Sequence, residues 1–119
     1  MKMKKLIVFL VIAFVGLTAE AQEKQVKKNK NAKFDIEVNG NCGMCKKRIE
    51  KAAYSVKGVK SAQWHQDHQD VHIILDENRT TIEEVHKAIA NVGHDTEKIK
   101  ADDETYEKLH HCCMYERKK

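Results

Sequence analysis

From residue 33 onward, the spacing of hydrophobic residues predicts a series of strands and helices. Apolar and acidic residues alternate over residues 34–38, a period of two that is typical of a half-buried strand. After a loop rich in Gly, Asn and Cys, apolar residues from Cys45 to Val56 recur at steps of three and four. This spacing predicts a helix that ends near Gly58.

The next elements follow the same kind of pattern. Residues 59–65 and 71–75 predict two strands of a hairpin around the polar segment 66–70. Thr80 or Thr81 can cap a second helix, whose apolar stripe ends before Gly93. A weaker strand is expected over 94–100, and a polar helix over about 102–109.

This order of elements indicates the fold class. It reads β-α-β-β-α-β over residues 33–100, followed by a C-terminal segment, 101–119, that holds a short helix and a Cys/His-rich tail. The expectation is therefore an α+β protein with a ferredoxin-like βαββαβ sandwich. A core of roughly a dozen apolar side chains is adequate but small for a domain of this size.

The first 21 residues have a different character. Three lysines precede an apolar run over residues 6–17, and a small-x-small sequence follows at 19–21. The run is shorter than the roughly 20 residues that a membrane-spanning helix needs. The pattern predicts a cleavable signal peptide over 1–21, and residues 22–32 read as a basic flexible linker. We therefore expect a periplasmic or secreted protein with no stable membrane insertion after cleavage.

Net charge gives no support for a nucleic-acid partner. The whole chain carries +4, of which the three lysines and Glu20 of residues 1–21 contribute +2, leaving +2 on the mature chain. This charge is too balanced to predict nucleic-acid binding. The excess of lysine is local to the linker.

The four cysteines fall into two local pairs. Cys42 and Cys45 form a C-x-x-C sequence, whereas Cys112 and Cys113 are adjacent near the other end of the domain. An exported chain with four cysteines would ordinarily suggest two disulfides, but neither local pair would join distant segments. Cross-pairing stays open, and metal binding accounts for the spacing at least as well.

The C-x-x-C sequence lies between the first strand and the first helix. Unpaired N–H groups and the dipole at a helix N-terminus favour the thiolate form of a cysteine. Two thiolates three residues apart can hold one soft ion, and Cu(I) suits such a low-coordinate site best. Hg(II) and Zn(II) are the alternatives among metals.

A thiol–disulfide redox protein that uses Cys42 and Cys45 is the alternative function, because Cys-Gly-x-Cys before a helix is also typical of thioredoxin-like proteins. Those folds place a cis-proline beside the dithiol, and this chain contains no proline. The elements that follow the motif also complete a ferredoxin-like unit. Both observations favour a metal site.

The tail concentrates potential metal ligands. Residues 110–114, His-His-Cys-Cys-Met, offer five donors in five residues. They predict that Cys112 and Cys113 bind metal, either by completing the Cys42/Cys45 site or at a second site, with a disulfide as the remaining possibility. Tyr106 and Leu109 share a helix face and are expected to dock this segment on the domain.

Other ring side chains receive structural interpretations. The histidines of the hairpin region, 65, 68 and 72, are expected to be solvated, and His86 to be exposed on the polar side of the second helix. Trp64 is expected at the sheet edge or in the core.

Residues 34–100 resemble the heavy-metal-associated domain family, which includes copper chaperones, the N-terminal domains of copper ATPases and the periplasmic mercuric-ion-binding protein. The resemblance is carried by four stretches: VNGNCGMC at 38–45, IEKA at 49–52, VKGV at 56–59 and ANVGH at 90–94. It implies the ferredoxin-like fold, a non-enzymatic metallochaperone or ion-transport role, and metal capture by Cys42 and Cys45.

Two positions of this chain, Gly40 and His94, can be compared with the pattern of the family. The family usually has a buried Met two residues before the first cysteine, where this chain has Gly40. His94 follows Gly93 at a position that lies near the metal in this family, so the resemblance implies a third ligand or a residue that tunes the thiolates. The expected partners are a metal-transporting ATPase or another thiol-bearing acceptor.

Overall fold

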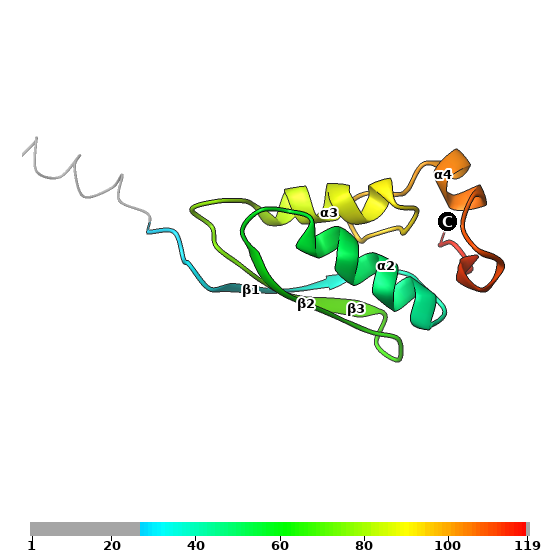
Figure 1. Ribbon diagram of the computed structural model, residues 1–119, viewed down its shortest axis with the longest axis horizontal. Helices are drawn as coiled ribbons and strands as arrows, with labels where there is room; N and C mark the ends of the chain where they lie inside the picture. The colour runs from blue at the N-terminus through cyan, green and yellow to red at the C-terminus, as the bar shows by residue number, and fades with distance from the viewer. Residues whose placement is uncertain (1–26, 119) are drawn as a thin grey trace, which may run out of the picture.

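The computed structural model describes residues 27–118, and the predicted signal peptide lies outside these residues. Three antiparallel strands form one sheet in the order β1-β3-β2 (Figure 1). They are β1, Ala32–Glu37, β2, Val59–His65, and β3, Asp70–Leu75. The central strand β3 pairs with both neighbours; its pairing with β1 is regular, whereas its pairing with β2 has an irregularity between Val59 and Ser61.

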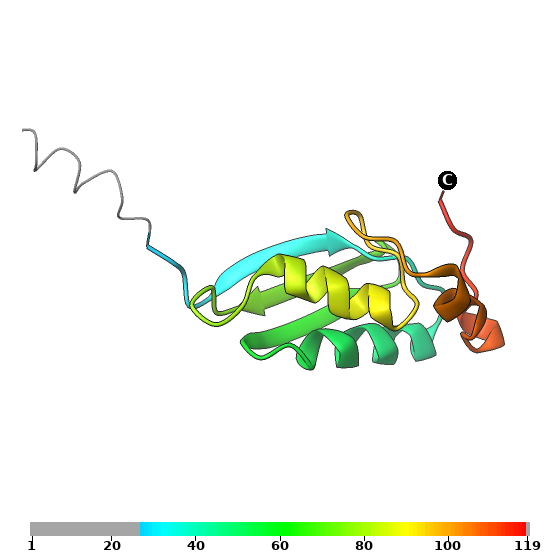
Figure 2. The ribbon, with the colours of Figure 1, turned by 90° about the horizontal axis from the view of Figure 1, so that it is seen from above.

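Two helices cover one face of this sheet (Figure 2). They are α2, Gly43–Tyr54, and α3, Ile82–Asn91. A short helix α4, Asp103–Glu107, and a 3-10 turn η1, His111–Cys113, follow at the end where α2 begins (Figure 1). The predicted α+β ferredoxin-like class, with its short C-terminal helix, is confirmed. Among residues 27–118, no helix has the length and apolarity that a membrane crossing requires.

The core lies between the sheet and the two helices, where the predicted apolar faces meet. Along β3, Val71, Ile73 and Leu75 are buried while His72 is exposed, as a strand with one face on a core requires. Ile49 of α2 and the apolar stripe of α3 cover these side chains. Trp64 is 2 % exposed and its indole N–H donates to the carbonyl of Val38, 2.9 Å away.

The predicted strand over 94–100 is wrong as a continuous element. Only an isolated antiparallel bridge, Val38 to Thr96, joins this segment to the edge of the sheet. The Thr96 hydroxyl accepts the backbone N–H groups of Lys98 and Ile99, at 3.3 and 3.0 Å, and so closes a turn. A side chain that satisfies the next backbone donors competes with the ladder of a sheet, which ends the pairing after one bridge.

His86 also departs from expectation, because it is 1 % exposed rather than solvated. The folded-back segment covers it, and its Nδ1 lies 2.7 Å from the Thr96 hydroxyl. Burial is the main reason that the pKa of His86 lies below its ordinary value. The neutral imidazole is therefore the form that the fold favours.

This burial predicts a pH dependence of stability. The unfolded chain binds the proton of His86 more readily than the folded chain, so the free energy of unfolding of the metal-free, reduced protein falls as the pH drops through the ordinary histidine range near 6.5. His86→Gln puts a side chain that does not titrate in place of the imidazole. It should reduce the fall of the free energy of unfolding with decreasing pH, by at most about 1.4 kcal/mol per pH unit for the one proton removed. Urea unfolding at pH 5.5 and 7.5 measures it.

The control is His68→Gln, which removes an exposed imidazole of the hairpin turn. It should change the slope of stability against pH less than His86→Gln does. An identical slope in His86→Gln and the unsubstituted protein would contradict the assigned burial.

Candidate metal centre

The C-x-x-C sequence spans the start of α2, as predicted. Cys42 is the N-cap residue, with extended backbone angles of φ −145° and ψ 177°, and Cys45 is on the first turn. The two Sγ atoms lie 3.6 Å apart. Cys45 is fully buried and its sulfur accepts the backbone N–H of Asn41 at 3.3 Å. One thiol is thus fixed under the loop and the other is presented at its surface.

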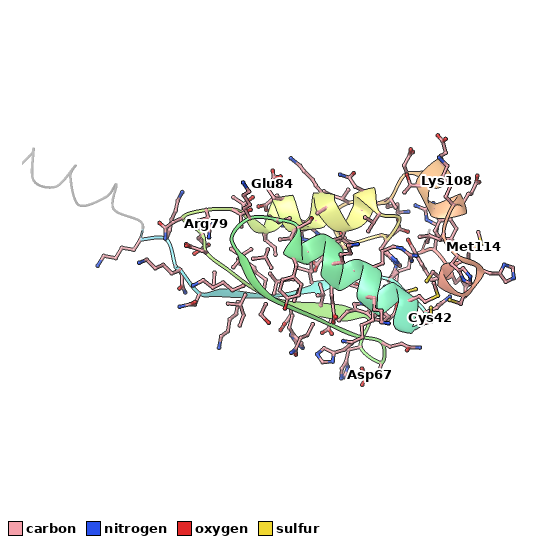
Figure 3. All side chains as sticks on the ribbon, viewed as in Figure 1. Cys42, Asp67, Arg79, Glu84, Lys108 and Met114 are labelled. Atoms are coloured by element: carbon pink, nitrogen blue, oxygen red, sulfur yellow. The ribbon has the colours of Figure 1, made fainter. Side chains whose placement is uncertain are left out.

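The C-terminal tail brings the second cysteine pair to the same place. Cys112 Sγ lies 3.0 Å and Cys113 Sγ 3.4 Å from Cys42 Sγ, although about 70 residues separate them in the sequence. Figure 3 shows the sulfur atoms gathered between the start of α2 and the tail, close to the labels of Cys42 and Met114. The tail therefore folds over the C-x-x-C loop.

Together these residues form a sulfur cluster, by which we mean the thiols of Cys42, Cys45, Cys112 and Cys113. All four are free. Within it, Cys42, Cys112 and Cys113 have ligand atoms that all lie within 4.8 Å of one another, the distance at which one ion can be shared. The thioether of Met44 is adjacent, 3.5 Å from Cys112 Sγ.

The thiols do not ionise alike. Burial opposes the thiolate of Cys42, but hydrogen bonds from Cys112, the Cys45 backbone and Cys113 outweigh it and lower the pKa of Cys42 to about 6. Burial raises the pKa of Cys45, and for Cys112 the hydrogen bond to Cys42 is the main cause of a raised pKa. Among these three thiols, the surroundings of Cys42 favour the thiolate, whereas those of Cys45 and Cys112 favour the protonated thiol.

His94 is buried beside the tail. It is not part of the group of three thiols whose sulfur atoms lie within 4.8 Å of one another. Its Nδ1–H donates to the carbonyl of Asn39 at 2.8 Å, and its Nε2 has no hydrogen-bond partner among residues 27–118. Burial lowers its pKa to about 4, so the ring is neutral. It stacks on Tyr115, with ring centroids 5.4 Å apart. A ligand role for His94 stays a prediction.

The hairpin turn and the core hold the loop from the other side. The side chain of Gln69 accepts the backbone N–H of Gly40 at 3.0 Å, and the side chain of Gln66 donates to the carbonyl of Asn41. A Cβ on Gly40 would lie 3.0 Å from both the Trp64 ring and the Cβ of Cys45. The indole therefore fills the space beneath the loop.

Two residues of this region, Tyr115 and Arg117, were not identified from the sequence. Both contact Asp95, from 20 and 22 residues away. An aromatic residue and an arginine just beyond Cys112 and Cys113 were the available signal, because such side chains are typical anchors. No hydrophobic periodicity in the sequence distinguished Tyr115 or Arg117 from their neighbours.

Comparison with known proteins decides the family. The heavy-metal-associated domain matches residues 35–95. The chain belongs to this family. It is a family of metal-binding domains rather than of enzymes, which favours a metal site over the redox alternative.

Relatives of this heavy-metal-associated domain agree with that assignment. A copper chaperone, CopZ, of Staphylococcus haemolyticus is 36% identical over 61 residues, which are 50% of this chain and 90% of the chaperone. The solved structure of a CopZ metallochaperone is 27% identical, with a TM-score of 0.53, and aligns over 55% of this chain and 98% of that one. A copper binding domain from HMA7, a P-type ATPase, is 26% identical, with a TM-score of 0.53, over 55% of this chain and 89% of that one.

The packing beneath the loop predicts that an alanine substitution destabilises the protein at Gly40 but not at Gly43. Gly40→Ala should lower the free energy of unfolding by about 1–3 kcal/mol, because its Cβ meets the Trp64 ring and the Cβ of Cys45 at 3.0 Å. Gly43→Ala is the matched control, since nothing lies within 4 Å of its Cβ at the start of α2. It should be neutral or slightly stabilising. Urea unfolding of both variants checks this, and equal stabilities would contradict the described packing.

Proposed function

We propose that this protein is an extracytoplasmic soft-metal-binding protein that captures Cu(I) at the sulfur cluster, with Cys42 and Cys45 as ligands of the loop and Cys112 and Cys113 as ligands of the tail. The observation that carries the proposal is the position of Cys42 Sγ. The three other thiol sulfurs lie 3.0, 3.4 and 3.6 Å from it. This arrangement offers thiolates, with a thioether adjacent, as ligands to an incoming ion.

The chemistry of the donors supports Cu(I). Thiolate and thioether sulfur are soft donors, which select Cu(I) and also Hg(II), whereas Zn(II) accepts sulfur and nitrogen alike. The copper chaperone of Staphylococcus haemolyticus, 36% identical over 61 residues, supports copper among these ions. Hg(II) and Zn(II) are the competing outcomes of a metal analysis.

Binding begins at the Cys42 thiolate. With a pKa lowered to about 6, Cys42 offers a negative sulfur at neutral pH, and the entering ion then displaces the protons of the neighbouring thiols. As each further Cu–S bond forms, one proton leaves to solvent. Delivery reverses the sequence: a thiolate of an acceptor forms a bond to the ion while a thiolate of this chain leaves and is protonated.

Location and partner follow from the sequence and the relatives. The basic and apolar pattern of residues 1–21 supports export through a cleavable signal peptide, and the basic residues that follow would link it to the domain, whose first strand begins at Ala32. The likeness to a copper binding domain of a P-type ATPase supports a metal-transporting ATPase or another thiol-bearing protein as the acceptor or donor.

Removing the loop ligands tests the proposal. Loss of a residue that only supports a metal ligand typically weakens binding about 10–100-fold. Cys42→Ser/Cys45→Ser removes two direct ligands, so it should weaken Cu(I) binding by more than this. Competition against a coloured Cu(I) chelator, with reduced protein under anaerobic conditions, measures the affinity. Metal analysis of the protein as isolated identifies the ion.

His68→Gln serves as the control, since its imidazole lies on the exposed hairpin turn and should not affect binding. Cu(I) affinity equal to that of the unsubstituted protein in Cys42→Ser/Cys45→Ser would exclude the proposed site.

A further inference from the structure

The tail that carries Cys112 and Cys113 is fixed just beyond them by Tyr115. This side chain is 2 % exposed. Its hydroxyl accepts the backbone N–H of Asp95 at 2.7 Å and donates to the carbonyl of Gly93 at 2.9 Å. Its ring lies between the stacked imidazole of His94 and the edge of Tyr106. Both polar and apolar parts of the residue are thus satisfied by the domain.

Arg117 provides a second anchor. Its guanidinium makes two hydrogen bonds to the carboxylate of Asp95, at 2.9 and 2.8 Å, and one to Asp103 at 2.7 Å. It also donates to the carbonyl of Ala101 at 2.6 Å and lies over the ring of Tyr106. The Asp95 side chain is only 4% exposed, so this forked pair holds a buried charge that has no water to replace it.

These anchors determine where the tail thiols lie. Only Met114 separates Tyr115 from Cys113, and the turn between them is closed by hydrogen bonds of 2.8 Å from Cys113 N–H to His110 and from Tyr115 N–H to Cys113. Cys113 is fully buried. Ordering this segment loses conformational entropy, and the contacts of Tyr115 and Arg117 offset that loss when the protein folds. Metal binding therefore does not have to offset it a second time.

We propose that residues 112–117 form a latched ligand arm, in which Tyr115 and Arg117 are positioning residues that hold Cys112 and Cys113 against Cys42. The site then binds its soft metal ion through at least three thiolates of one chain. This inference rests on the proposed function and adds the coordination and the residues that enforce it.

The sulfur spacing supports three or four ligands over two. At a metal–sulfur distance of about 2.3 Å, two thiolates in line lie about 4.6 Å apart and three in a plane about 4.0 Å apart. The sulfurs around Cys42 are separated from it by 3.0–3.6 Å, and Cys112 and Cys113 by 3.9 Å. Cys112 and Cys113, 3.9 Å apart, already have the spacing of trigonal ligands, and Cys42 Sγ reaches it by moving about 0.6–1.0 Å away from them. A linear ion needs about 1.0 Å of separation between the loop cysteines and would leave both tail thiols unbound beside Cys42.

A latched arm changes how the ion leaves. An acceptor that approaches a two-thiolate loop can add its own thiolate at an open position. Here the arm covers Cys42, so the acceptor must displace Cys112 or Cys113 first. The arrangement favours retention of the ion, as in sequestration, until a partner with competing thiolates displaces the arm.

The test compares Arg117→Gln with Glu116→Gln, a matched change at the exposed neighbouring residue. Full-length reduced protein is loaded with Cu(I) in chelator competition, and separately with Cd(II), whose sulfur-to-metal charge-transfer absorption grows with the number of bound thiolates. Arg117→Gln should weaken Cu(I) binding at least about tenfold and lower the absorption to the level of Cys112→Ser/Cys113→Ser. Glu116→Gln should match the unsubstituted protein in both.

Tyr115→Phe is the second variant, which keeps the ring and removes only the hydroxyl. It should shift both readouts in the same direction by a smaller amount, and its near-native structure can be verified by circular dichroism even if Arg117→Gln unfolds. Unchanged affinity and absorption in Tyr115→Phe and in Cys112→Ser/Cys113→Ser would overturn the latched arm. If the unsubstituted protein also failed to bind Cu(I), the proposed function itself would fail.

Discussion

The site depends on one geometric constraint, the convergence of the C-x-x-C segment and the C-terminal tail on the sulfur of Cys42. An extended residue at the start of a helix presents its side chain outward from the helix end, and here that position meets the first turn of α2 on one side and the tail on the other. A thiolate on Cys42 disfavours a second thiolate on the thiols close to it, since like charges repel. An ion that replaces the thiol protons removes this repulsion, which is why the arrangement suits a cation of soft character.

The rest of the domain holds these segments in place. The hairpin turn hydrogen-bonds to the loop through Gln66 and Gln69, and the Trp64 ring packs beneath Gly40. On the far side, Asp95 joins the short edge segment to the tail through its backbone and its carboxylate. The loop and the tail are thus supported by different parts of the core, and the sulfurs meet between them.

Local patterns were sufficient for most of the fold and half of the site. The alternation over residues 34–38 and the helical stripe from Cys45 to Val56 each report an element with one buried face, and both are confirmed. Position of the C-x-x-C pair at a helix start is likewise a local property. The strand over 94–100 was wrong because the Thr96 hydroxyl closes a turn, an effect that depends on a side chain rather than on periodicity.

Contacts between distant residues could not be predicted in the same way. His86 lies four residues after Ile82 and three before Ile89, at the border of the apolar stripe, and only the segment folded over it decides its burial. Docking of the tail depends on Tyr115 and Arg117 meeting Asp95, and no spacing in the sequence encodes that pairing. The sequence-based hypotheses for Cys112 and Cys113 therefore left several geometries open. The structure places both thiols beside Cys42, and their role as ligands stays a prediction.

The number of sulfur atoms bound to the ion tests this account most directly. X-ray absorption at the copper edge of the Cu(I)-loaded protein, carrying one ion per chain as checked by native mass spectrometry, counts these neighbours. The account predicts three or more sulfurs, falling to two in Cys112→Ser/Cys113→Ser. Two sulfurs in both proteins would contradict it.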